Sequence, residues 1–230
     1  MPQNRVIAFL VLYQTRPFSK LFYENFHRHV RDVDLLLVDN NLNPKCPETC
    51  WARSIPHYLA NRAADKSHGA GMDCAVEWAR ARGYQRLVHV EPDCAMNGRI
   101  WLDTLLRSDA WFAGLHRKRY GPIHPCPSVF DLSAPLPSFC AAQKIPAELR
   151  HPRYGELFNP SGLPQWCKER WDTAQKAWFW CAVENQAELV PIPAQQIGGH
   201  LLMGDFVHFW RGSTRPPAPE EKALLRTVRN

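Results

Sequence analysis

The sequence predicts an α/β domain in which a mostly parallel β-sheet is flanked by helices. Apolar runs of strand length occur at 6–13, 34–41 and 86–93, and the segments between them carry apolar residues at helical spacing. Continuous apolar strands are typical of a sheet buried on both faces. Their alternation with amphipathic helices is typical of parallel pairing.

The first half of the chain supplies these elements in a regular order. A buried strand at 6–13 precedes a helix at 19–30, and the second strand at 34–41 precedes a turn-rich stretch at 42–56. The next helix, 69–83, has apolar residues three and four apart and ends at a glycine. Glycine is the usual C-terminal signal of a helix.

The alternation continues past the middle of the chain and then breaks. After the strand at 86–93 we predict a helix at 99–108 and a strand at 110–116. Prolines are dense from 120 to 165, which predicts a loop-rich insert that packs on the sheet and shapes a pocket. A helix and two strands are predicted after the insert: 170–187, 188–193 and 204–210.

The composition is that of an ordinary folded protein. Of the 230 residues, 45% are hydrophobic and 22% are charged, and we predict one domain over 1–212 followed by a tail at 213–230. No run approaches the roughly 18 apolar residues of a membrane-spanning helix, and no cleavage site follows the first apolar run, so a cytoplasmic protein is the default expectation. The net charge of +6 favours anionic partners such as nucleoside diphosphates.

The eight cysteines are scattered along the chain, which predicts reduced thiols in the cytosol. Cys46 and Cys50 form the one closely spaced pair, so a disulfide or a zinc site at this pair is the alternative. No second pair at the spacing of a zinc ribbon accompanies them.

Polar residues follow each of the three apolar runs. Tyr13 ends the first, and Asp39 with Asn40 ends the second. Glu91 and Asp93 end the third. Ligands of open parallel sheets bind beyond the carboxyl ends of the strands, so these are candidate binding residues. The acid pair is suited to hold a divalent cation against a diphosphate, and the alternative is a pair of solvated turn acids.

Four blocks of the chain, in order, resemble the family 2 class of GT-A glycosyltransferases, whose fold is Rossmann-like. They are the first strand ending in Tyr13, the strand LLLVDNN, the stretch 67–93 from a glycine-containing turn to an Asp-x-Asp-like motif, and 171–193. The resemblance covers residues 5–115 and, more loosely, 169–212.

This resemblance implies a metal-dependent enzyme with a donor half at 1–118 and an acceptor half at 119–212. Asp39 would hydrogen-bond the imide of the nucleobase, with Tyr13 stacked near it and Asn40 in the same donor site. Asp93 would ligate Mn²⁺ or Mg²⁺. Glu91 occupies the first acidic position, which faces the ribose or the sugar.

Residues late in the chain would complete the site. Asp172 matches the general base that deprotonates the acceptor hydroxyl. Trp171 stands where an acid commonly precedes that base, so Glu169 is the fallback. His208 matches a late metal ligand, and His200 is its rival or lines the acceptor site.

The remaining donor contacts are basic residues and a glycine turn. Lys66, His68 and Gly69 lie at the start of a predicted helix, where backbone N–H groups commonly bind phosphate. The alternative is that the glycines only allow the helix to approach the sheet. Arg211 follows the last predicted strand and would close on the diphosphate.

The resemblance therefore predicts a glycosyltransferase of hexosyltransferase type (EC 2.4). It would move a sugar from a nucleoside-diphosphate sugar, with a UDP-sugar favoured, to an acceptor hydroxyl with inversion. The acceptor is left open among a saccharide, a lipid carrier, a peptide, a natural product and a modified nucleic acid. One alternative is a catalytically degenerate GT-A binding protein, because Glu91 replaces the usual first Asp. The other is a nucleotidyltransferase of related fold, although no glycine-rich loop follows the first strand.

Overall fold

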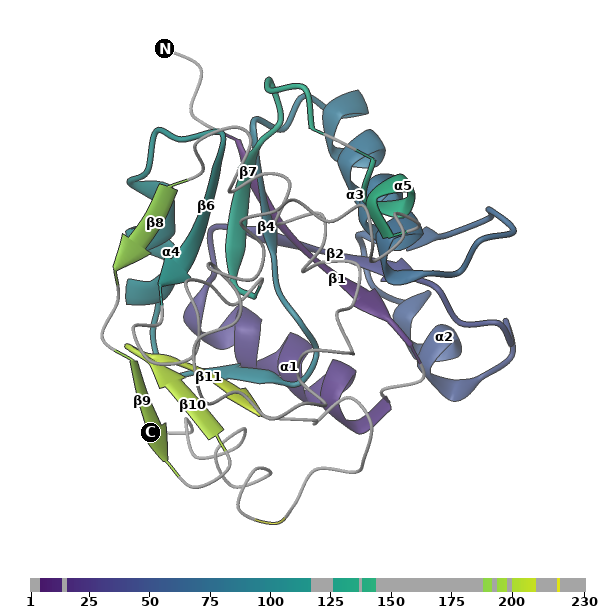
Figure 1. Cartoon of the computed structure of the whole chain (residues 1–230). Helices are drawn as coiled ribbons and strands as arrows, with labels where there is room; N and C mark the ends of the chain where they lie inside the picture. Colours follow the sequence, from purple (N-terminus) through teal and green to yellow (C-terminus); the bar gives the residue numbers. More distant parts are fainter. Residues whose placement is uncertain are drawn as a thin grey trace, which may run out of the picture.

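The computed structural model describes the chain most fully in its first half. The described residues are 5–13, 16–116, 126–136, 138–143, 188–191, 194–197, 200–209 and 219. Within them the chain forms two β-sheets, and helices pack on both faces of the larger one (Figure 1).

Seven strands make up the larger sheet: β1 (Val6–Leu12), β2 (Asp34–Asp39), β3 (Tyr58–Ala60), β4 (Arg86–His89), β6 (Phe112–His116), β7 (Ser128–Asp131) and β8 (Glu188–Pro191). Their order is β3-β2-β1-β4-β7-β6-β8. The pairs β3–β2, β2–β1, β1–β4 and β6–β8 are parallel, and β7 runs antiparallel to both neighbours. The predicted fold class, a mostly parallel sheet flanked by helices, is confirmed.

The smaller sheet is antiparallel and joins distant parts of the chain. Its four strands are β5 (Cys94–Met96), β9 (Ala194–Ile197), β10 (His200–Met203) and β11 (Phe206–Phe209). They lie in the order β5-β11-β10-β9, so β5 is paired with the last strand of the chain that the structure describes.

The helices divide between the two faces of the larger sheet. On one face α1 (Arg16–His29) and α4 (Ile100–Leu106) contribute Phe22, Phe26 and Trp101 to a buried cluster. On the other face α3 (His68–Ala81) and α5 (Phe139–Gln143) contribute apolar residues to a second cluster. Successive residues of β1 alternate between the two clusters, as the pleat of a strand requires. The sheet is therefore buried on both faces, as its apolar strands predict.

Helix α3 has clear sequence signals at both ends and a close contact in its first turn. The Ser67 hydroxyl accepts a hydrogen bond from the Ala70 N–H, and Gly83 beyond the helix has φ of +71°. A Cβ on Gly71 would lie 2.7 Å from Val11 Cγ1 and 2.9 Å from Asn40 Nδ2. Gly71 is therefore the residue that lets α3 approach the end of the sheet.

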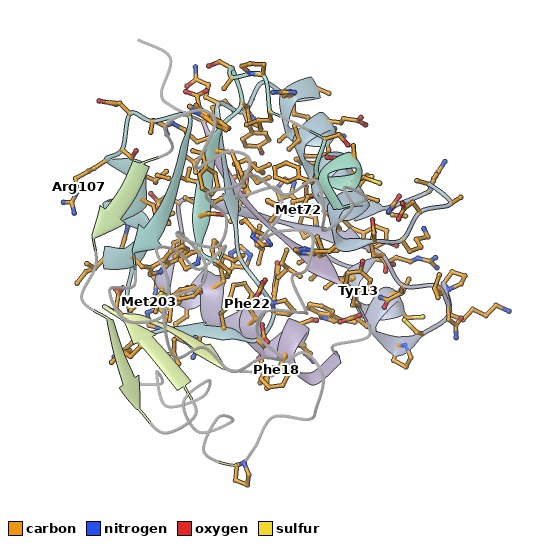
Figure 2. All side chains as sticks on the ribbon, in the orientation of Figure 1. Tyr13, Phe18, Phe22, Met72, Arg107 and Met203 are labelled. Atoms are coloured by element: carbon orange, nitrogen blue, oxygen red, sulfur yellow. The ribbon has the colours of Figure 1, made fainter. Side chains whose placement is uncertain are left out.

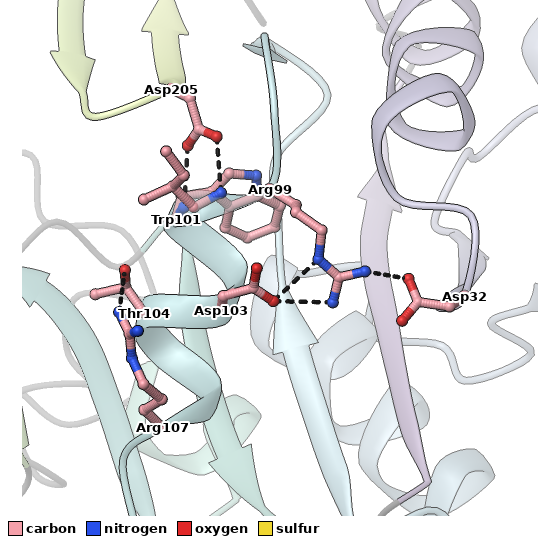
Figure 3. A network of polar contacts seen from close by, with 8 residues as sticks. Asp32, Arg99, Trp101, Asp103, Thr104, Arg107 and Asp205 are labelled. Atoms are coloured by element: carbon pink, nitrogen blue, oxygen red, sulfur yellow. Dashed lines mark hydrogen bonds and ion pairs between the residues drawn. The ribbon is translucent and has the colours of Figure 1, made fainter.

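The start of α4 is fastened to the smaller sheet by one carboxylate. Asp205, in the turn between β10 and β11, accepts hydrogen bonds from Ile100 N at 2.7 Å and Trp101 N at 3.0 Å (Figure 3). Arg99, which precedes the helix, pairs with Asp32 and with Asp103. An acid from another sheet thus caps a helix whose own N-cap residue provides no side-chain cap.

Several expectations about the elements were wrong in detail. The stretch 42–56 contains a helix, α2 (Pro47–Ala52), and β3 follows it. The strand expected over 86–93 ends at His89. The expected loop-rich insert contains β7 and α5. In each case the element is short and depends on pairing or packing with distant residues.

Two further predictions concern a helix late in the chain and membrane-spanning segments. The helix predicted at 170–187 lies outside the described residues. No helix in the described part of the chain is long and apolar enough to cross a membrane.

Candidate functional site

The carboxyl ends of three adjacent parallel strands lie at one edge of the larger sheet. β2, β1 and β4 are neighbours in that order. Asp39 is the last residue of β2, Tyr13 follows β1, and the stretch 91–93 follows β4. Tyr13 stands at this edge with 40% of its surface exposed (Figure 2). The strand-end residues singled out in the sequence therefore share one edge, where parallel sheets bind ligands.

The Asp39 carboxylate is held in place by two donors. Its Oδ1 accepts the Asn41 N–H at 2.9 Å and its Oδ2 accepts the Tyr58 hydroxyl at 2.8 Å, and the residue is 5% exposed. Burial is the main cause of the raised pKa of the Tyr58 hydroxyl, and the hydrogen bond to Asp39 raises that pKa further. Arg53 bonds to the same hydroxyl, which raises the pKa of its guanidinium. Asp39 is thus an oriented acceptor, and Tyr58 is a supporting residue that the sequence pattern did not single out.

Asn40 ties the end of β2 to the loop before α3. Its amide nitrogen donates to Ser67 O at 2.8 Å and to Lys66 O at 3.3 Å, and its amide oxygen accepts from Asn61 Nδ2 at 2.7 Å. The Tyr13 hydroxyl also donates to Lys66 O. These bonds give Asn40 a positioning role, whatever it contacts in a ligand.

Lys66 and Gly69, both predicted as donor contacts, lie in or next to this loop. The Lys66 ammonium donates to Asn61 O, so its charge is directed back onto the loop. Gly69 is buried in the first turn of α3. The close helix–sheet contact in this turn is made at Gly71.

A buried polar cluster that includes residues of α2 lies next to the site. Glu48, which is 2% exposed, accepts from Asn41 Nδ2 at 2.9 Å and from the Ser19 hydroxyl. Asn41 also donates to Thr49 Oγ1 at 3.2 Å. The cluster joins α1, α2 and the end of β2, so it fixes the backbone next to Asp39.

Two histidines lie beside Tyr13 on the α3 face. His68 is the first residue of α3, and its ring centroid is 6.5 Å from that of Tyr13 and 5.3 Å from that of His89. His89, the last residue of β4, is fully buried and packs on Phe9 with a centroid distance of 5.1 Å. Sequence reasoning did not single out His89, because it stands inside an apolar run.

The two predicted metal ligands come from strands that pair with each other. Asp93 is 3% exposed and immediately precedes β5, and His208 on β11 is paired with Cys94. His200, its rival, lies on β10, one strand further from β5. A carboxylate and an imidazole are ligand types that suit Mn²⁺, so these two residue types are compatible with the predicted ion. Among the side chains described, no three histidines, cysteines or acids group closely enough to hold a metal.

A pair of buried thiols lies directly behind the acids. Cys94 Sγ and Cys126 Sγ are 3.6 Å apart, and both residues are fully buried. Burial raises the pKa of Cys94 well above its usual range and that of Cys126 to about 11, and Glu91 and Asp93 add to both shifts. These thiols stay protonated at neutral pH, which is the behaviour of packing residues.

The other close cysteine pair has separate roles. The Cys46 sulfur caps α2 by accepting from Thr49 N at 3.5 Å, and Cys50 is an exposed free thiol.

The predicted catalytic base Asp172, its fallback Glu169 and the predicted diphosphate contact Arg211 lie outside the described residues. Their roles stay predictions.

No family model matches the chain, and no curated protein matches it. Among solved structures it is similar to a protein of Desulfovibrio desulfuricans G20 described as a nucleotide-diphospho-sugar transferase. The two share 14% identity and a TM-score of 0.47 over 82% of this chain and 80% of the other.

Two further likenesses are to enzymes solved with their nucleotide sugars. Glucosyl-3-phosphoglycerate synthase from Mycobacterium tuberculosis, in complex with Mn²⁺ and UDP-glucose, shares 8% identity at a TM-score of 0.44, over 56% of this chain and 57% of the other. The mannosyltransferase PcManGT from Pyrobaculum calidifontis, in complex with GDP-mannose and Mn²⁺, shares 13% identity at a TM-score of 0.41, over 55% and 44%. These three structural neighbours are described as nucleotide-sugar transferases or were solved with nucleotide sugars, and their likeness to this chain concerns the fold.

Proposed function

We propose that the protein is a metal-dependent glycosyltransferase that takes its sugar from a nucleoside-diphosphate sugar. One observation carries the proposal. The adjacent strands β2, β1 and β4 end at the same edge in an oriented carboxylate, an exposed aromatic ring and an acid pair. In that order these groups suit a nucleobase, its stacking partner and a metal-bound diphosphate.

Asp39 and Tyr13 would bind the nucleoside. Both oxygens of Asp39 already have one donor, and each keeps a second lone pair for the imide N–H of a uracil. The Tyr13 ring is the exposed aromatic surface next to it and suits stacking. A carboxylate acceptor also suits the N1–H of guanine, so we favour UDP and test GDP beside it.

Asp93 and His208 would hold Mn²⁺ or Mg²⁺, and Glu91 would face the ribose or the sugar. When bound, the ion neutralises the charge that develops on the departing nucleoside diphosphate. The chain's own contribution is a nearly buried carboxylate, whose attraction for a cation is screened little by water.

The transfer itself would proceed with inversion in one step. The acceptor hydroxyl loses its proton to Asp172 while its oxygen bonds to the anomeric carbon, and the bond from that carbon to the diphosphate oxygen breaks. The acceptor is a compound with a free hydroxyl, such as a saccharide or a lipid carrier.

Calorimetry with UDP tests the donor site. The purified protein is titrated with UDP in the presence of Mn²⁺, then with EDTA in its place, and both titrations are repeated with Asp93→Ala. We expect binding that EDTA weakens at least tenfold and that Asp93→Ala weakens to a similar extent. Asp109→Ala is the matched control. Asp109 is an exposed acid that precedes the amino end of β6, so it lies on the side of the sheet opposite the carboxyl ends of β1, β2 and β4.

Failure to bind UDP, GDP, CDP or TDP would overturn the proposal. Binding that is indifferent to EDTA and to Asp93→Ala would instead favour a degenerate fold that binds nucleotides without transfer. Release of pyrophosphate from a nucleoside triphosphate and a sugar phosphate would identify a nucleotidyltransferase.

A further inference from the structure

A row of four side chains leads from the exposed edge of the site into the protein. It begins at Tyr13, continues through the rings of His68 and His89, and ends at Ser128. Tyr13 is 40% exposed, whereas His89 is fully buried and Ser128 is 1% exposed. The row therefore connects the surface at which a donor would enter with a polar position in the interior.

The pairing of β4 with β7 fixes the inner end of this row. His89 is the register partner of Ser128, and Leu87 is the partner of Phe130 two residues further along. Leu87 and Phe130 both belong to the cluster under α3 and α5. Because side chains alternate along a strand, Ser128 lies on the same face as His89 and as the first turn of α3.

Two polar atoms of the row are buried without a hydrogen bond. His68 Nδ1 and Ser128 Oγ each have almost no solvent contact and no hydrogen-bond partner within the described chain. Buried polar groups are almost always paired in native proteins, because an unpaired one is destabilising. Two such atoms, on residues that both neighbour the buried His89, indicate a place that a ligand completes.

The position of the row in the sheet points to one part of the donor. Across the sheet the order is Asp39 at the end of β2, Tyr13 after β1, the acids after β4, and Ser128 on β7. If Asp39 meets the base and Asp93 meets the diphosphate, the group attached beyond the diphosphate lies toward β7. That group is the sugar.

We propose that His68 and Ser128 bind hydroxyl groups of the sugar carried by the donor, an inference that rests on the proposed function. An imidazole nitrogen and a serine hydroxyl can each donate or accept, which matches sugar hydroxyls, since these do both. Neither residue is a carboxylate, which would repel the neighbouring diphosphate. Neither is a lysine, whose ammonium group would bind the diphosphate in place of the sugar. The two residues then select among sugars, and Asp39 selects the base.

Paired titrations test this assignment with Ser128→Ala and His68→Phe. Each variant is titrated with UDP and with UDP-glucose, UDP-N-acetylglucosamine and GDP-mannose, in the presence of Mn²⁺. We expect roughly threefold to tenfold weaker binding of the nucleotide sugar that the wild type prefers, and a clearly smaller change in the binding of UDP. Ser133→Ala is the matched control, because Ser133 follows the far end of β7 and bonds to Asp131.

Thermal unfolding without ligand gives a second readout. Because Ser128 Oγ has no partner in the described chain, Ser128→Ala should leave the melting temperature unchanged or raise it. A residue that served only to hold the fold would lower it. A fall in melting temperature, together with equal weakening of UDP and UDP-sugar binding, would overturn the assignment.

The outcomes separate this inference from the function beneath it. If the wild type binds no nucleoside diphosphate, both the proposed function and the sugar subsite are refuted. If the wild type binds UDP and a UDP-sugar and both variants match it for each, the function stands and the subsite is refuted.

Discussion

The end of β2 and the row from Tyr13 to Ser128 differ in how their buried polar side-chain atoms are hydrogen-bonded. Around Asp39, Asn40, Asn41 and Glu48 the side-chain groups are joined by hydrogen bonds from several elements. Along the row, His68 Nδ1 and Ser128 Oγ are buried without such bonds in the described part of the chain. The first region is built before a ligand arrives, and the second is completed by one. Removing a polar group should therefore destabilise the protein in the first region and not in the second.

Loss of the Glu48 carboxylate should have the largest effect. Glu48→Ala removes one buried acceptor of Asn41 Nδ2, which keeps Thr49 Oγ1, and the carboxylate that accepts from the Ser19 hydroxyl. We expect the free energy of unfolding to fall by about 2–4 kcal/mol, measured by urea denaturation. Glu77→Ala, at an exposed position of α3, is the control and should change it by less than about 0.5 kcal/mol. Equal values for the two variants would remove the distinction between the regions.

The capping acid of α4 should come next. Asp205→Ala frees the Ile100 and Trp101 N–H groups and should lower the free energy of unfolding by about 1–2 kcal/mol. Asp205→Asn keeps a side-chain oxygen and should recover part of that loss. If Asp205→Ala were neutral in thermal unfolding, the link between α4 and the smaller sheet would not contribute to stability.

Removal of the Tyr58 hydroxyl should have a smaller effect on stability and a specific one on binding. Tyr58→Phe releases Asp39 Oδ2, so we expect a loss of about 1 kcal/mol and roughly threefold weaker UDP binding. Tyr84→Phe is the matched control. Its hydroxyl bonds to Asp34, the first residue of β2, at 3.3 Å. A weaker affinity for UDP in both variants would mean that Tyr58 does not act through Asp39.

Up to pH 9 the buried thiols should give the smallest effect, and it depends on pH. The pKa of Cys126 is raised from 9.0 to about 11, so the unfolded thiol ionises at a lower pH than the folded one. Stability is complete below pH 9 and is lost as the pH rises from about 9 to 11. At pH 9 the loss is less than about 1 kcal/mol. Cys126→Ala should flatten this part of the stability profile, and an unchanged profile would contradict the raised pKa.

The sequence predicted the elements whose signal is local. The apolar runs of β1 and β2 and the spacing of α3 with its terminal Gly83 correspond to elements in the structure. β5 and β7 have only three and four residues, and distant strands supply their partners. A pattern in one short segment cannot contain that information. One signal was overlooked, because Pro47 followed by Glu48 is typical of the first turn of a helix.

The residues of the candidate site also divide into those that the sequence pattern reveals and those that only the strand pairing reveals. Strand-end residues such as Asp39 and Asp93 are recognisable because their polarity interrupts an apolar run. Tyr58 and Ser128 are not, because each matters through a neighbour that is distant in sequence. Supporting residues of a site are defined by contacts, and contacts appear only when the strands are paired.

The pairing of β5 with β11 also constrains how the protein folds as it leaves the ribosome. β1, β2 and β4 can assemble once the first ninety or so residues have emerged, since each finds its partner within that stretch. β5 lacks the strand partner that the structure describes for it until residues 206–208 of β11 have been synthesised. A nascent chain arrested between these points should therefore expose the strand next to Asp93 to chaperones, and the acid pair should reach its final surroundings only after β11 has been synthesised.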